Sequence, residues 1–267
     1  MISAATRLAG VIGDPVRHSL SPTLHNAAYR ALGLDWVFLA FEVPDGRAPG
    51  ALSAARAFGL VGLSVTMPHK RAMAELCDDL SPQAAALRSV NTVTLRPDGY
   101  AVGETTDGAG FLRSLADAGV DPGGRSVVIL GAGGAARAVA RALRDANATV
   151  AVAARRPEAA AEVGGAPVAW ADRADAVAAA DLVVNATPVG MAGDSSLPIP
   201  PEVLGPSHVV ADLVYEPRET PLLAAARARG ARVVPGLGML VYQAALQVER
   251  WTGRAAPIDA MRTAAAS

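Results

Sequence analysis

The chain has little cysteine and no long apolar run. Cys77 is the only cysteine in 267 residues, which excludes a disulfide framework and a cysteine-ligated zinc site. No segment approaches the ~18 uninterrupted apolar residues of a membrane span, and residues 1–12 lack the pattern of a signal peptide. The net charge is −1 and like charges do not cluster, so nothing indicates a nucleic-acid or membrane-surface partner. We therefore expect a soluble, cytoplasmic, globular protein.

Lysine and asparagine are also scarce. Lys70 is the only lysine among 24 basic residues, and the others are arginines. A guanidinium cannot give up its proton, so a single lysine kept in such a chain is informative. Aliphatic and aromatic residues make up 51% of the chain and charged residues 18%, which indicates one or two well-packed domains.

Short apolar runs alternate with helical patterns along the whole chain, which is typical of an α/β protein. In the first hundred residues we expect strands near 7–12, 36–43, 61–66, 90–95 and 100–104. Helices are expected over 22–32, from Pro68, and from Thr106-Asp107 to Gly119. Six later strands, separated by helices, predict a doubly wound, mostly parallel sheet. They lie near 126–130, 149–153, 167–170, 181–185, 208–212 and 231–234. A long helix over 238–252 and a short one from Pro257 are expected to return to the first domain.

A glycine-rich turn follows the first strand of this second sheet. The segment from Gly131 to Ala136 reads G-x-G-x-x-A between a strand and a helix, the fingerprint of a dinucleotide site. Gly131 permits the tight turn, and Gly133 lets the backbone approach a pyrophosphate held by the helix N-terminus. A turn without a ligand is the alternative, which the register of strand, helix and next strand disfavours.

The end of the next strand bears on the choice of nicotinamide cofactor. Residues 150–154 contain no acidic residue that would bind a ribose 2′-hydroxyl, and Arg155 and Arg156 follow them. An arginine at this place suits a 2′-phosphate. A solvated arginine pair is the alternative, but together with the missing acid the pair favours NADP.

The first domain must supply the substrate site. Ser21-Pro22 fits a helix cap, yet two hydroxyls at a helix start, Ser19 and Ser21, also suit a carboxylate. Lys70, Asn91 and Asp107 each lie at the end of an expected element. They could converge on a polyhydroxylated molecule, and their spacing leaves this open.

Eight motifs in order give the chain a strong resemblance to the shikimate dehydrogenase family. They are HSxSPxxHN, VTxPxK, VNT, TDG, GAGGA, NATPxGM, DLVYxPxxTPLL and GLGMLVxQAxxxxxxWTG. The resemblance implies NADP-dependent interconversion of 3-dehydroshikimate and shikimate, a step towards aromatic amino acids. It also implies a substrate domain, residues 1–104 completed by the C-terminal helices of 238–267, and a Rossmann-type NADP domain over 105–237.

The resemblance also implies roles for single residues. Ser19 and Ser21 would bind the substrate carboxylate, with Tyr215 beside them. The ring hydroxyls would be bound by Thr66, Lys70, Asn91, Asp107 and Gln243. Lys70 would be the proton-transfer residue, and Asp107 its partner. The pyrophosphate would be bound by Gly131, Ala132, Gly133, Gly134 and Ala135. Asn185 and Thr187 would line the cofactor cleft, and Leu213 and Gly236 would border the nicotinamide.

Two departures from the family pattern are visible. Ser64 stands where the family often has asparagine before Val-Thr, and Ala154-Arg155-Arg156 stands for Asn-Arg-Thr. The four histidines (His18, His25, His69 and His208) have no metal-ligand spacing.

Several alternatives stay open. One is a quinate or aminoshikimate dehydrogenase of the same family. Another is a non-catalytic NADP-binding regulator, which would be free to lose Lys70 and Asp107. Lys70 can act as a base or as an electrostatic stabiliser, and the chain can be a monomer or a homodimer.

Overall fold

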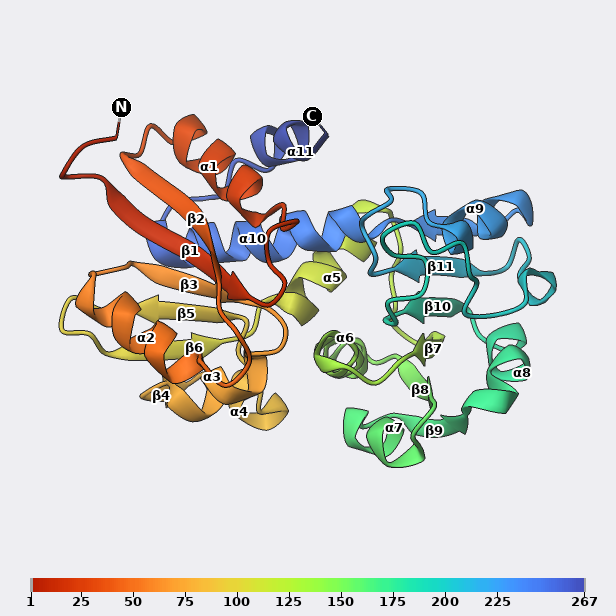
Figure 1. Ribbon diagram of the computed structural model, residues 1–267. Helices are drawn as coiled ribbons and strands as arrows, with labels where there is room; N and C mark the ends of the chain where they lie inside the picture. Colours follow the sequence, from red (N-terminus) through yellow and green to blue (C-terminus); the bar gives the residue numbers. More distant parts are fainter. Residues whose placement is uncertain (1, 267) are drawn as a thin grey trace. The chain divides into compact units, whose positions relative to one another are not determined.

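A computed structural model describes residues 2–266 and divides the chain into two compact units (Figure 1). The first unit is Met1–Thr106 with Val241–Ser267, and the second is Asp107–Leu240. Met1 and Ser267, the two ends of the expected substrate domain, lie outside the described residues. The predicted α/β class, with an N-terminal α/β domain and a Rossmann-type domain, is confirmed.

The first unit holds a six-stranded mixed sheet of order β2-β1-β3-β5-β6-β4. Its strands are β1 (Arg7–Gly13), β2 (Trp36–Glu42), β3 (Gly62–Val65), β4 (Asp79–Leu80), β5 (Thr92–Leu95) and β6 (Ala101–Glu104). Strand β5 runs antiparallel to both of its neighbours, whereas β1 is parallel to β2 and β3. The start of β5 therefore lies at the same edge of the sheet as the ends of β1 and β3.

Helices cover both faces of this sheet. They are α1 (Ser21–Ala31), α2 (Ala48–Ala57), α3 (Lys70–Leu76), α4 (Pro82–Leu87), α10 (Gly236–Thr252, in this unit from Val241) and α11 (Ile258–Ala266). Leu52, Met73 and Ala84 of α2, α3 and α4 share one buried cluster with Leu63 and Val93 of the sheet. On the other face, Trp251 of α10 donates from Nε1 to the Val93 carbonyl at 3.2 Å. Helix α10 is thus part of the first unit's core.

The second unit is a parallel sheet of order β12-β11-β10-β7-β8-β9, the doubly wound arrangement. Its strands are β7 (Ser126–Leu130), β8 (Thr149–Ala154), β9 (Ala166–Ala169), β10 (Leu182–Asn185), β11 (Val209–Asp212) and β12 (Arg232–Val234). One face carries α5 (Asp107–Asp117), α6 (Gly134–Asp145) and α7 (Pro157–Val163). The other carries α8 (Arg173–Ala178) and α9 (Pro221–Ala228). Short 3₁₀ turns lie at Trp170–Asp172 and Pro201–Val203.

Two local expectations are wrong. Leu20, not Ser21, is the N-cap of α1, and no side chain caps this helix. The Ser19 hydroxyl oxygen accepts from the Ser21 amide at 3.2 Å, so the local hydrogen bond runs within the turn before the helix. Helix α3 begins at Lys70 rather than Pro68, because the preceding residues form a turn closed by the His69 amide and the Thr66 carbonyl at 3.0 Å.

The described residues, 2–266, include no helix long and apolar enough to cross a membrane. The same part of the chain contains no cluster of three His, Cys, Asp or Glu side chains suited to a metal ion.

His25 is a fully buried titratable group in the first unit. Its Nδ1 lies 2.8 Å from the Ser21 carbonyl oxygen, which can only accept, so Nδ1 carries the proton. The ring stacks on Phe38 with centroids 4.0 Å apart. Burial lowers the pKa of His25 from 6.5 to about 4, because the interior disfavours the imidazolium. The imidazole is therefore neutral and structural at pH 7.

This burial predicts a loss of stability in acid. Between pH 6.5 and 4 the unfolded chain binds a proton at His25 that the folded chain does not, so the free energy of unfolding falls as pH falls. The contribution from pH 7 to pH 5 is about 2 kcal/mol. Urea unfolding of wild type and His25→Leu at the two pH values measures it. An equal pH dependence in both proteins would contradict a neutral His25.

Candidate active site

Three loops of the first unit meet at the edge where β1 and β3 end and β5 begins. The Asp14 amide donates to the Met67 carbonyl at 2.9 Å, which joins the loops after β1 and β3. The Val90 amide donates to the Lys70 carbonyl at 2.9 Å, which joins the start of α3 to the segment before β5. Side chains from three separate parts of the sequence are therefore presented at one edge.

Ser19 and Ser21 lie in the first of these loops and at the first residue of α1. The Ser21 side chain belongs to a buried residue, and Ser19 is half-buried. Because the Ser19 oxygen accepts from the Ser21 amide, its own proton is left to donate elsewhere. The two serine hydroxyls therefore lie at the turn that leads into α1 and at its first residue.

Thr66 and Lys70 come from the second loop. Thr66 directly follows β3 and lies against Gly13, where an added Cβ would collide with the threonine methyl. Gly13 therefore allows Thr66 to sit close to the end of β1. Lys70 is the first residue of α3 and is half-buried.

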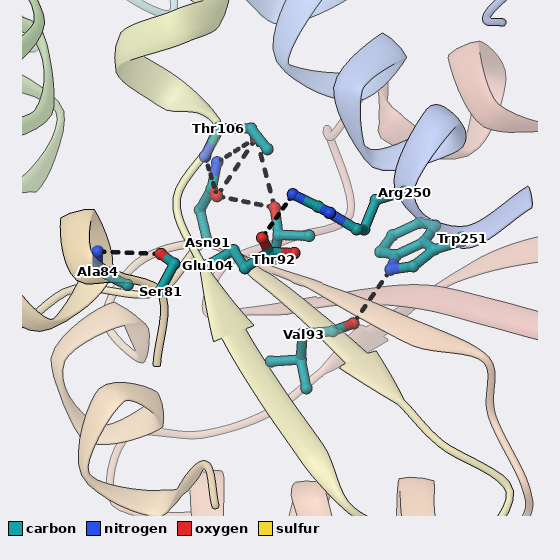
Figure 2. A network of polar contacts seen from close by, with 9 residues as sticks. All are labelled: Ser81, Ala84, Asn91, Thr92, Val93, Glu104, Thr106, Arg250 and Trp251. Carbon is teal, nitrogen blue, oxygen red and sulfur yellow. Dashed lines mark hydrogen bonds and ion pairs between the residues drawn. The ribbon is translucent and has the colours of Figure 1, made fainter. Parts of the chain in front are cut away.

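Asn91 precedes β5 and is held by several short hydrogen bonds (Figure 2). Its Oδ1 accepts from the Thr106 amide and from the Thr92 hydroxyl, each at 2.8 Å. Its Nδ2 donates to the Thr106 hydroxyl at 3.0 Å. The amide of Asn91 thus ties the start of β5 to the segment that follows β6.

Helix α10 reaches the same place. Gln247 donates from Nε2 to the Asn91 carbonyl at 3.2 Å and to the Thr92 hydroxyl at 3.0 Å. Gln243 lies four residues earlier, hence on the same face of the helix, and is buried. Arg250 pairs with Glu104 at 2.7 Å, so the C-terminal part of α10 is fastened to the sheet (Figure 2).

The structure thus brings six of the predicted substrate residues to one edge of the first unit: Ser19, Ser21, Thr66, Lys70, Asn91 and Gln243. Asp107 and Tyr215 belong to the second unit. Asp107 is the first residue of α5 and directly follows Thr106 in the chain. Tyr215 follows β11, and its burial, with a smaller contribution from the charge of Glu216, raises its pKa.

In the second unit, the glycine-rich turn has one crowded and one open glycine. Gly131 has φ +104°, and an added Cβ would lie 2.8 Å from the Ala186 carbonyl oxygen, so it must be glycine for the fold itself. Gly133 is the extended N-cap of α6, and a Cβ there would meet nothing within 4 Å. No packing contact accounts for glycine at 133, whereas a phosphate lying against its backbone would.

Other predicted cofactor residues surround the carboxyl ends of these strands. Ala132 and Ala135 flank the open turn and are half-buried, while Gly134 begins α6. Arg155 and Arg156 follow β8 and are exposed.

Two further predicted cofactor residues lie near the end of β11. Leu213 directly follows this strand and is half-buried. At Gly236, an added Cβ would lie 2.6 Å from the carbonyl oxygens of Asp212 and Val214, so the chain passes close to this strand end.

Asp212 is a buried carboxylate that the sequence pattern did not single out as a site residue. It accepts from Asn185 Nδ2 at 2.9 Å, the Thr220 hydroxyl at 2.6 Å and the Val214 amide at 3.0 Å. Asn185 in turn accepts from the Thr187 hydroxyl at 2.6 Å. Burial raises the pKa of Asp212, and these three hydrogen bonds oppose it. Its only sequence signal is its place at a strand end within the DLVY motif.

Comparison with known proteins matches three parts of the chain to described domains. Residues 11–93 match the shikimate dehydrogenase substrate binding domain, and residues 236–266 match the shikimate 5′-dehydrogenase C-terminal domain. Residues 126–209 match a domain described as NADP oxidoreductase coenzyme F420-dependent. A shikimate dehydrogenase (NADP(+)) of Moorella thermoacetica is 47% identical over 97% of this chain and 92% of its own length. The chain belongs to the shikimate dehydrogenase family.

Solved structures in this family extend the comparison. The shikimate 5-dehydrogenase of Thermus thermophilus, in complex with NADP(H) and shikimate, is 38% identical with a TM-score of 0.90. The match covers 97% of this chain and 98% of the Thermus chain. The quinate dehydrogenase of Corynebacterium glutamicum, in complex with NAD, is 34% identical with a TM-score of 0.91, covering 98% and 99%. The fold of the family therefore accommodates more than one substrate and cofactor.

The two glycines of the turn predict opposite phenotypes. Gly133→Ala meets open space, so the free energy of unfolding should change by no more than about 1 kcal/mol. The added methyl group should nevertheless weaken NADP binding about tenfold or more, because it keeps a phosphate from the backbone. Gly131→Ala is the matched control and should itself destabilise the fold by about 2 kcal/mol or more. Urea unfolding and NADPH fluorescence titration measure the two effects. Normal NADPH affinity in Gly133→Ala would exclude this turn as the phosphate site.

Proposed function

We propose that this protein catalyses the reversible, NADPH-dependent reduction of 3-dehydroshikimate to shikimate. The observation that supports the proposal is the edge of the first unit, to which three loops and α10 bring residues with hydroxyl, amide and ammonium groups. Membership of the family gives this polar edge its substrate class, a hydroxylated ring that bears a carboxylate. The proposal places the enzyme in the cytoplasm, as a monomer or homodimer acting on small molecules.

The substrate carboxylate is assigned to Ser19 and Ser21, with Tyr215 as a third contact. The Ser19 oxygen accepts from the Ser21 amide, so its proton is available to a carboxylate oxygen. The positive end of the α1 dipole adds to this preference for an anion. The ring hydroxyls are assigned to Thr66, Asn91 and Gln243, whose side chains supply neutral hydrogen-bond donors and acceptors.

The cofactor is assigned to the carboxyl edge of the second sheet. The open space at Gly133 fits the backbone approach of a pyrophosphate, which the segment Gly131 to Ala135 would hold at the α6 N-terminus. Arg155 and Arg156 would hold the 2′-phosphate of NADP. Asn185, Thr187, Leu213 and Gly236 would line the nicotinamide end. When bound, this cofactor supplies or accepts the hydride.

Lys70 is assigned to the oxygen that changes between alcohol and ketone, with Asp107 as its partner. Its ammonium either gives a proton to that oxygen or stabilises negative charge on it. The buried histidine nearest in sequence cannot replace it, because His69 Nε2 is directed at the Val43 carbonyl oxygen at 2.7 Å. His25 is likewise held by a backbone carbonyl.

The proposed function is tested by initial rates with shikimate and quinate, each with NADP⁺ and with NAD⁺. Shikimate with NADP⁺ should give the highest kcat/KM of the four combinations. A higher kcat/KM for quinate would assign the chain to the quinate-oxidising members of the family. Absence of turnover with all four, in folded protein that binds NADPH, would favour a non-catalytic NADP-binding protein.

Substitution of Lys70 tests its assignment. Lys70→Ala should lower kcat by about 10²–10⁴-fold while NADPH affinity and the unfolding midpoint stay unchanged, because the side chain acts on the reacting oxygen. Lys70→Arg separates the two roles: a guanidinium keeps the charge but does not release a proton. Much of the rate should survive in Lys70→Arg if the role is electrostatic and be lost if it is proton transfer. Near-normal turnover of Lys70→Ala would remove Lys70 from the reaction.

A further inference from the structure

A chain of buried hydrogen bonds runs beneath Asn91, through side chains that have no assigned role. The Ser64 hydroxyl on β3 lies 2.5 Å from Oε1 of Gln247 on α10. Gln247 Nε2 contacts the Asn91 carbonyl and the Thr92 hydroxyl, and Thr92 contacts Asn91 Oδ1. All four residues are at most 5% exposed, so water does not substitute for these partners.

The directions of these hydrogen bonds follow from groups that can only accept or only donate and, for Thr92, from the shorter of two distances. The Asn91 carbonyl can only accept, so the Gln247 atom facing it is Nε2 and the atom facing Ser64 is Oε1. The Ser64 hydroxyl therefore donates to Gln247. Both hydrogens of Nε2 are used on the Asn91 carbonyl and on Thr92, so the Thr92 hydroxyl must donate its own proton to another group. Asn91 Oδ1, at 2.8 Å, is a closer acceptor than the Thr106 hydroxyl at 3.3 Å, so the proton is directed to Asn91 Oδ1.

The same reasoning orients the side chain of Asn91. The Thr106 amide can only donate, so the atom 2.8 Å from it is Oδ1. With Thr92 donating as well, both lone pairs of Oδ1 are engaged inside the protein. Any contact of this side chain with a substrate is then one in which Nδ2 donates.

We infer that Gln247, anchored by Ser64, is a positioning residue that fixes Asn91 as a hydrogen-bond donor toward the substrate. Gln247 does so at two points, through the Asn91 backbone carbonyl and through the Thr92 hydroxyl. The identity of the acceptor, a ring hydroxyl of shikimate, rests on the proposed function. This role explains the serine at position 64, since its hydroxyl donates to Gln247 Oε1 and gives the Gln247 side chain a defined orientation.

Gln247→Glu tests this inference with little change of shape. An ionised carboxylate accepts only, so it would take the single Thr92 proton away from Asn91 Oδ1 and repel the Asn91 carbonyl. A carboxyl group protonated by burial has one O–H in place of two N–H groups, so one of the two contacts of Gln247 Nε2 is lost in either form. The KM for shikimate should rise about tenfold, with kcat changed by less than about threefold and the KM for NADP⁺ unchanged. Trp251→Phe is the matched control, because it removes the α10 hydrogen bond to Val93 without touching Asn91. It should lower the unfolding midpoint and leave the KM for shikimate as in wild type.

A second readout needs no substrate. The chain has only four asparagines (Asn26, Asn91, Asn147 and Asn185), so ¹⁵N-asparagine labelling gives four side-chain amide pairs. The Asn91→Ala variant assigns its own pair. Gln247→Glu, or Ser64→Ala if the first variant does not fold, should shift the Asn91 pair and leave that of Asn147 in the second unit in place.

The two experiments separate the inference from the proposed function. An unshifted Asn91 amide pair, or a KM for shikimate that follows stability equally in Gln247→Glu and Trp251→Phe, would overturn the positioning role. Wild-type protein that does not turn over shikimate would overturn the proposed function, and the amide spectrum would still decide whether Gln247 orients Asn91.

Discussion

The hydrogen bonds of the Asn91 side-chain amide hold together the edge of the first unit where β1 and β3 end and β5 begins. This amide joins the start of β5 to Thr106 by bonds of 2.8 and 3.0 Å, and Gln247, 156 residues further along the chain, holds the Asn91 backbone carbonyl. The two ends of the first unit are therefore fastened at the point where the predicted substrate residues gather. A buried polar group is costly unless it is fully bonded, so this network admits few alternative arrangements.

The two units solve different recognition problems. The first presents side chains whose donors and acceptors are already oriented, as hydroxyls on a ring require. The second presents backbone and open space at Gly133, as a pyrophosphate requires. Buried Asp212 accepts hydrogen bonds from Asn185 and Thr220, so the ends of β10 and β11 are tied to each other and to the start of α9. In the proposed function, the cofactor would supply the hydride chemistry, and the chain would contribute orientation and the ammonium group of Lys70.

Much of this organisation could be predicted from local patterns. The parallel sheet of the second unit follows from its apolar runs and the glycine-rich turn, and the order of the eight motifs is enough to indicate the family. Local patterns failed where a neighbouring segment decides the outcome. Ser21 fits a cap by composition, yet the turn before it makes Leu20 the N-cap. Pro68 fits a helix start, yet a turn precedes α3, which begins at Lys70.

The roles of Ser64, Asp212 and Gln247 arise from contacts between distant segments, and such contacts leave no periodic signal in the sequence.

The most direct test of this account is the affinity of shikimate for the protein saturated with NADPH, a combination that cannot turn over. Calorimetric titration should compare wild type with Asn91→Asp, which can still accept from Thr92 and Thr106 but has no N–H to donate. The account predicts a folded variant that binds NADPH normally and binds shikimate about tenfold more weakly or worse. Equal affinity of the two proteins for shikimate would show that Asn91 is not a donor to the substrate, and would contradict the site described for this edge.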